Sequence, residues 1–262
     1  MEESLNLFDD WSDIYDLVYS WKRDDIPFYI EEALKSGGPV LELGCGTGRV
    51  TIPIADSGIY IYGMDFSTKM IEMARLKSTL HVKQLSNVNW LVGDMREFSL
   101  DQKFSLIIIP FRGFMSLLTI GEQRSCLNCV RDHLEPGGKL ILDLFVPDID
   151  LISDVEDTPF HFGDVYDEEG GGKLVVWHQN SFDTYNQINS ARSIIEKVTS
   201  GGFVEWKKYM DFQIRYSHRF EMQYLAELSG FEIYDLYGNY NKVQFDEQST
   251  EMIWILVPSI SE

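Results

Sequence analysis

The sequence predicts an α/β protein with a doubly wound, mostly parallel sheet. Short apolar runs alternate with amphipathic segments over residues 39–146, which is typical of βαβ units. Residues 105–109, Ser-Leu-Ile-Ile-Ile, are apolar almost throughout, as expected of a strand that is buried on both faces. A glycine-rich turn at residues 44–48 joins the first apolar run to a helical segment, as in open α/β sheets that bind ligands at their strand ends.

The elements of this block follow one another along the chain. The expected strands are residues 40–43, 59–65, 88–92, 104–109 and 139–145. The expected helices are residues 49–57, 68–78 and 122–134. Pro136, Gly137 and Gly138 are expected to form the turn that ends the last helix.

Further elements are expected on both sides of this block. Two helices precede it, over residues 10–19 and from Asp24 or Asp25 to Lys35. Alternating polarity over residues 173–182, 187–199 and 203–216 predicts an inserted antiparallel sheet. A helix from about Ser217 to Ser229 and strands over residues 231–237 and 252–257 close the chain. The expected division is a helical layer at 1–38, the α/β domain at 39–146 and 217–262, and the insert at 147–216.

The net charge of −20, from 22 basic and 42 acidic residues, restricts the class of partner. Such a surface repels phosphate backbones and anionic lipids, so we expect neither nucleic acid nor a membrane as a partner. Residues 39–146 hold 11 basic and 11 acidic residues, so the excess acidity lies in the rest of the chain. No cationic signal or apolar run of bilayer length is visible, and three cysteines suit a reducing compartment. We expect a soluble, cytoplasmic protein.

The loop at residues 44–48 is the most informative motif. Its glycines let the backbone turn tightly and let a ligand approach the amides of the helix that follows. The third glycine, Gly48, comes one residue earlier than in the GxGxxG dinucleotide fingerprint. Glu42 precedes the loop, and a carboxylate suits a ligand with an ammonium group better than one with two phosphates. A nicotinamide-dependent oxidoreductase is therefore the less favoured alternative.

Two other strand ends carry carboxylates that suit a nucleoside. Asp65 ends the second strand, where a carboxylate accepts hydrogen bonds from ribose hydroxyls; it, or Ser67, is alternatively the N-cap of the next helix. After the third strand, Asp94 is placed to accept from an adenine amino group, with Met95 against the ring. Ends of neighbouring parallel strands meet at one sheet edge, where open α/β sheets bind their ligands.

The segments ELGCGTG, GMDFS, GDM and LEPGG resemble the class I S-adenosylmethionine-dependent methyltransferases over residues 39–146 and in the closing portion, 230–257. The resemblance implies a seven-stranded sheet whose last strand, residues 252–257, is antiparallel. It implies S-adenosylmethionine as the cofactor, with its methionine end at the glycine loop, its ribose at Asp65 and its adenine at Asp94. The expected cofactor-binding residues are Tyr15, Glu42, Gly44, Cys45, Gly46, Gly48, Asp65, Phe66, Asp94, Met95, Pro110 and Phe111.

The resemblance also implies a reaction, transfer of a methyl group by in-line displacement to N or O of a small molecule. It places Tyr15 over the cofactor and Pro110 and Phe111 beside the methyl group, and the insert is similar to the substrate lids of small-molecule methyltransferases. No catalytic base and no metal are assigned. The alternatives are a non-catalytic S-adenosylmethionine-binding protein and the oxidoreductase.

Three further expectations concern the acceptor, the assembly and two of the histidines. Because the parts added to the α/β block are acidic, the acceptor is expected to be neutral or cationic, for example an amine. We expect a monomer or a homodimer. His81 and His133 are expected at the surface, away from the ligand crevice.

Overall fold

The structure is a computed structural model that describes residues 9–12, 14–83, 85–153, 158–166 and 172–259. The chain divides into two compact units, each described by itself below. The α/β unit consists of residues from 23 to 147 and from 217 onward, and the insert unit of residues up to 22 and 148–216. The helical layer expected at 1–38 is thus divided between the two units at residue 22.

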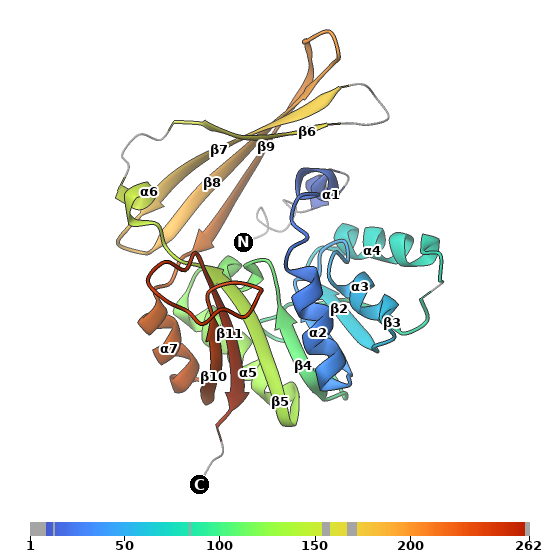
Figure 1. Cartoon of the computed structure of the whole chain (residues 1–262), viewed down its shortest axis with the longest axis vertical. Coiled ribbons are helices and arrows are strands. Elements are labelled where there is room, and N and C mark those ends of the chain that lie inside the picture. The colour runs from blue at the N-terminus through green and yellow to red at the C-terminus, as the bar shows by residue number, and fades with distance from the viewer. Residues whose placement is uncertain (1–8, 13, 84, 154–157, 167–171, 260–262) are drawn as a thin grey trace. The chain divides into compact units, whose positions relative to one another are not determined.

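The α/β unit contains a seven-stranded sheet in the order β10-β11-β5-β4-β1-β2-β3 (Figure 1). Strands β1 to β5 are parallel, and β11 is antiparallel to both of its neighbours, which confirms the predicted sheet. The strands are β1 Val40–Leu43, β2 Ile61–Asp65, β3 Val88–Val92, β4 Phe104–Ile109, β5 Leu134–Phe145, β10 Phe231–Tyr237 and β11 Glu251–Pro258. The flanking helices are α2 Ile26–Ser36, α3 Thr51–Asp56, α4 Thr68–Leu80, the 3-10 turn η2 Gly113–Ser116, α5 Ile120–His133 and α7 Arg219–Leu228.

The apolar side chains of the central strands form the core of this unit. Val40 pairs in register with Ile61 on one side and Leu106 on the other, and all three are buried. Tyr29 and Ala33 of α2 are completely buried in the same cluster. Each large apolar side chain buried in this way contributes about 1.5–3 kcal/mol. Helix α2 therefore belongs to the core of the α/β unit.

Helix caps settle one choice that the sequence left open and correct one prediction. Helix α4 begins after Ser67, whose hydroxyl accepts the Met70 N–H at 3.1 Å, so Ser67 takes the capping role and not Asp65. Helix α7 begins after His218, one residue beyond the expected cap at Ser217. Asp65 is thereby available for a different role at the edge of the sheet.

Strand β5 begins earlier than expected. The turn predicted at residues 136–138 is part of the strand, which starts at Leu134 opposite Phe104 and shifts register before Lys139 pairs with Leu106. A Cβ atom at Gly138 would lie 2.9 Å from the carbonyl oxygen of Phe104, so glycine permits this close approach of two backbones. The sequence pattern misled because Pro-Gly-Gly usually marks a turn.

His133 is buried, which corrects the expectation that it lies at the surface. Its Nε2 accepts the Leu100 N–H at 3.0 Å, and its Nδ1 lies 2.7 Å from the carbonyl oxygen of Cys129. Both ring nitrogens thus have backbone partners near the end of α5. The centre of the His133 ring lies 4.4 Å from the centre of the Phe98 ring. His133 has a structural role.

The insert unit contains a four-stranded antiparallel sheet in the order β6-β7-β8-β9, as predicted for this segment. The strands are β6 Phe160–Tyr166, β7 Lys173–Asp183, β8 Ile188–Val198 and β9 Val204–Arg215, and the helices are η1 Asp9–Trp11, α1 Tyr15–Val18 and α6 Ile149–Ser153. Strand β6 and helix α6 were not predicted, and the helix expected over 10–19 is divided into η1 and α1. Among the described residues, no helix is long and apolar enough to cross a membrane.

Candidate active site

The glycine loop after β1 is held by backbone hydrogen bonds. Gly44, Gly46 and Gly48 have φ angles of 71°, 54° and 87°, which favour glycine over any other residue. The Cys45 N–H donates to the carbonyl oxygen of Met64 on β2 at 3.0 Å, and the Gly48 carbonyl accepts the first α3 bond from Ile52 at 3.0 Å. The loop therefore presents the start of α3 at the carboxyl ends of the strands.

The space around this loop fits a ligand. A Cβ atom at Gly46 would meet nothing within 4 Å, so the backbone is open on that side. A Cβ atom at Gly44 would lie 3.5 Å from the Met95 methyl group, so the structure brings Met95 beside the loop. Its contact with adenine stays a prediction. Phe66, which follows β2, has an exposed ring. A glycine loop with open space beside it and apolar side chains nearby are features of sites that bind a nucleoside cofactor.

Asp65 ties the end of β2 to the glycine loop. Its Oδ2 accepts the Gly46 N–H at 2.8 Å and its Oδ1 accepts the Ser67 N–H at 2.8 Å. A carboxylate has about four lone-pair sites, so it can accept more than two hydrogen bonds at once. The tie to Gly46 was not expected from the sequence, which indicated a ribose contact or a helix N-cap for Asp65.

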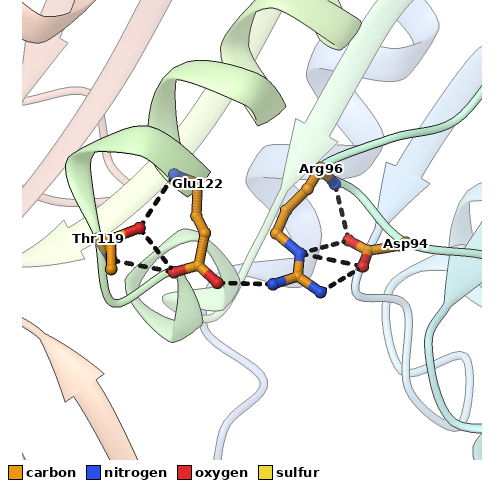
Figure 2. A network of polar contacts seen from close by, with 4 residues as sticks. All are labelled: Asp94, Arg96, Thr119 and Glu122. Carbon is orange, nitrogen blue, oxygen red and sulfur yellow. Dashed lines mark hydrogen bonds and ion pairs between the residues drawn. The ribbon is translucent and has the colours of Figure 1, made fainter. Parts of the chain in front are cut away.

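Asp94 forms an ion pair that the sequence reading missed. The guanidinium of Arg96 lies between the carboxylates of Asp94 and Glu122, with Nη2 2.6 Å from Asp94 Oδ2 and Nη1 2.6 Å from Glu122 Oε1 (Figure 2). Glu122 in turn closes the capping box of α5 with Thr119. Burial raises the pKa of Asp94, but the bonds from Arg96 outweigh it and hold that pKa below its ordinary value. Asp94 is therefore an anion, and Arg96 links it to Glu122 at the start of α5.

Ionisable side chains also lie next to the loop. Glu42 is buried and accepts a hydrogen bond from the Thr51 hydroxyl. Arg49, at the end of the loop, donates from both terminal nitrogens to the two oxygens of Asp25, at 2.6 and 2.7 Å. Asp25 precedes α2 and is fully buried, so this bidentate pair joins α2 to the loop. No local pattern in the sequence predicts this pair, because 24 residues separate its members.

The turn after β4 lies beside the same loop. The Arg49 guanidinium lies 4.9 Å from the centre of the Phe111 ring, within cation–π range. Pro110 and Phe111, the predicted wall of the methyl group, are thus beside the end of the glycine loop. Tyr15 lies on α1 in the insert unit, and its predicted contact with the cofactor stays a prediction.

A family model described as a methyltransferase domain matches residues 40–138, which include the glycine loop, Asp65, Asp94 and Phe111. This match supports a class I S-adenosylmethionine-dependent methyltransferase. The same match supports S-adenosylmethionine as the cofactor. The open space at Gly46 and the carboxylate of Asp65 fit this cation, which carries both an ammonium and a sulfonium group.

Three similar proteins extend this methyltransferase assignment beyond the matched domain. The cypemycin N-terminal methyltransferase of a Streptomyces species is 25% identical over 84% of this chain and 83% of its own. The structure of the CcbJ methyltransferase from Streptomyces caelestis has a TM-score of 0.78 at 26% identity and covers 95% of this chain and 96% of its own. The dTDP-3-amino-3,4,6-trideoxy-alpha-D-glucopyranose N,N-dimethyltransferase of Streptomyces venezuelae is 28% identical over 51% of this chain and 56% of its own.

The buried carboxyl group of Glu42 is expected to make the stability of the cofactor-free protein depend on pH. Burial raises the pKa of Glu42 from 4.5 to about 8, with Thr51 and Arg49 opposing the shift. Between these values the folded chain binds one more proton than the unfolded chain, so its free energy of unfolding falls as pH rises, by up to about 1.4 kcal/mol per pH unit. Glu42→Gln stays neutral and is expected to lack this decline. Urea unfolding of both proteins at pH 5.5, 6.5 and 7.5 measures the difference, and parallel pH profiles would contradict it.

Proposed function

We propose that this methyltransferase acts on the nitrogen of a small-molecule amine. Sequence reasoning left N and O open as acceptor atoms. The observation that favours nitrogen is that a relative matching 84% of the chain, insert unit included, is named for methylation of an N-terminus. The Streptomyces venezuelae relative, named for N,N-dimethylation of an amino sugar nucleotide, supports the same acceptor atom.

The charge of the protein agrees with an amine acceptor. The acidic excess of the chain lies outside residues 39–146, so it attracts a cation to parts of the protein other than the glycine loop. Nearby carboxylates also raise the pKa of an amine, and an ammonium ion has no lone pair for attack. The rate of transfer is therefore expected to rise with pH while the bound amine loses its proton.

We further propose roles for the residues at the sheet edge. The sulfonium cofactor supplies the methyl group when bound. The glycine loop, Asp65 and Met95 would hold its two ends, Glu42 would face its ammonium group, and the Phe111 turn would exclude water from the reacting atoms. Methyl transfer requires mainly alignment and desolvation, so in-line displacement needs no metal and no nucleophilic side chain.

A panel of matched acceptors tests the choice of nitrogen. Each pair contains an amine and the corresponding alcohol, such as a dTDP-3-amino sugar and its 3-hydroxy analogue, together with short peptides with free or acetylated N-termini. We expect S-adenosylhomocysteine and an N-methylated product, detected by mass spectrometry, only with the amine of a pair. Methylation of the alcohols alone would contradict the proposal. An Asp65→Ala variant assayed in parallel accounts for background hydrolysis of the cofactor.

A further inference from the structure

The turn after β4 has an unusual backbone. Phe111 and Arg112 are consecutive non-glycine residues with positive φ angles, 55° and 63°. Such a conformation is uncommon for any residue with a side chain and is an outlier for a bulky one such as phenylalanine. The Gly113 N–H closes the turn on the carbonyl oxygen of Pro110 at 3.2 Å. Strained backbone persists only where its surroundings hold it, and it concentrates at functional sites.

A buried carboxylate holds both strained residues. Asp143, near the end of β5, accepts the Arg112 N–H on Oδ1 at 2.8 Å and the Phe111 N–H on Oδ2 at 3.1 Å. The hydroxyl of Tyr240 also donates to Asp143 Oδ2. Asp143 is 1% exposed, although it lies on a strand whose neighbours are apolar. A buried anion among apolar residues is costly, and here it is matched by three donors, two of them the amides of the turn.

The loop between β10 and β11 brings Tyr240 to this carboxylate. The Tyr240 ring packs 5.8 Å from Phe28 of α2, and Lys242 in the same loop forms ion pairs with Glu31 and Glu32 of that helix. Glu251 at the start of β11 accepts from the Arg112 guanidinium at 2.7 Å. The turn is therefore held through its backbone by β5 and through a side chain by β11.

We propose that Asp143, assisted by Tyr240, is a positioning residue. It holds the Phe111–Arg112 turn in its left-handed conformation beside the glycine loop. Phe111 is the link to the reaction, because its ring lies 4.9 Å from the guanidinium of Arg49, which directly follows the glycine loop. The role in turnover rests on the proposed function. A neutral amide at position 143 would offer one acceptor oxygen to the turn and turn its NH2 group toward the other N–H, so the turn would relax.

Hydrogen exchange and turnover test this role together. In Asp143→Asn, the peptide that contains Phe111 and Arg112 is expected to exchange about tenfold faster, because its amides lose their acceptor. The turnover number with the best amine of the panel is expected to fall about 100-fold, the scale of loss for a misplacement of about 1 Å. S-adenosylhomocysteine is expected to bind within about threefold of wild type, since the hydrogen bonds that join Asp65 to Gly46 and Ser67 do not involve Asp143.

A second variant and a matched control separate positioning from general loss of structure. Tyr240→Phe removes only one of the three donors, so we expect the same two effects at smaller size, about threefold in turnover. Tyr237 and Asp235 form a similar hydroxyl–carboxylate bond at 2.9 Å on β10, and Tyr237→Phe is expected to change neither readout. Wild-type exchange at 111 and 112 in both Asp143→Asn and Tyr240→Phe would overturn the proposal. Unchanged turnover in Asp143→Asn, together with faster amide exchange at residues 111 and 112, would also overturn it. If wild type methylates no amine, the proposed function fails, while the exchange result still decides whether Asp143 holds the turn.

Discussion

Asp65→Ala is expected to weaken binding of S-adenosylhomocysteine by about 100-fold or more, since it removes charge-assisted hydrogen bonds of about 1.5–3 kcal/mol each. Two losses coincide in this variant. The ribose hydroxyls lose their acceptor, and the amides of Gly46 and Ser67, both 2.8 Å from the carboxylate, lose theirs. The glycine loop is then free to move away from the end of β2. Isothermal titration of the purified protein with S-adenosylhomocysteine measures the change.

Two asparagine variants make this result specific to the carboxylate at Asp65. Asp65→Asn keeps one acceptor oxygen and is expected to bind with intermediate affinity. Asp183 accepts the N–H groups of Tyr185 and Asn186, both at 3.0 Å, in a surface turn of the insert unit. Asp183→Asn removes the same kind of carboxylate–amide turn from a place with no assigned ligand, so wild-type affinity is expected there. Affinity of Asp65→Ala within threefold of wild type would show that the loop is held without it.

Gly48→Ala is expected to lower the free energy of unfolding by about 2–4 kcal/mol, from left-handed strain and overpacking together. Gly48 has a φ of 87°, and a Cβ atom there would lie 2.7 Å from the Trp90 ring and 3.0 Å from the end of Ile52. The Trp90 ring has little room to withdraw, because its Nε1 donates to the hydroxyl of Ser78 at 3.2 Å. Urea unfolding in the absence of cofactor measures the loss.

Two other glycines with positive φ provide controls for Gly48. Gly46→Ala and Gly37→Ala carry the same kind of strain at φ of 54° and 75°, but their Cβ atoms would meet nothing within 4 Å. Each is expected to cost only about 1–2 kcal/mol. Gly46→Ala alone is expected to weaken S-adenosylhomocysteine, because its methyl group enters the open space in front of the loop. A larger loss of stability in Gly46→Ala than in Gly48→Ala would contradict this account.

The parts of the site that the sequence predicts are those encoded over short distances. Glycine spacing gives the loop, and the ends of apolar runs place Asp65 and Asp94 at one edge, since parallel strands end together. Asp94 and Arg96 are two residues apart just after a strand, and this spacing was the available signal for their ion pair. Strand β6 was missed because its aromatic residues are exposed and do not alternate in burial.

Other parts depend on contacts between distant segments and leave no local pattern. Tyr240 reaches Asp143 across 97 residues, and Arg112 reaches Glu251 across 139. Asp143 reads in the sequence as an interruption of an apolar strand, and only the tertiary structure shows which amides it accepts. Buried charges whose partners are remote in sequence are therefore the residues that the sequence leaves unassigned.

The way the chain passes between its two units has an evolutionary consequence. Every strand pairing described here lies within one unit, and the insert unit is made from the N-terminal segment together with residues 148–216. The insert unit can thus diverge by exchange of these two segments without altering the hydrogen-bond ladder of the seven-stranded sheet. The segments must change as a pair, because Trp21 of the first packs 5.8 Å from Phe162 of the second. A chimera that exchanges the insert alone inherits a mismatched aromatic contact.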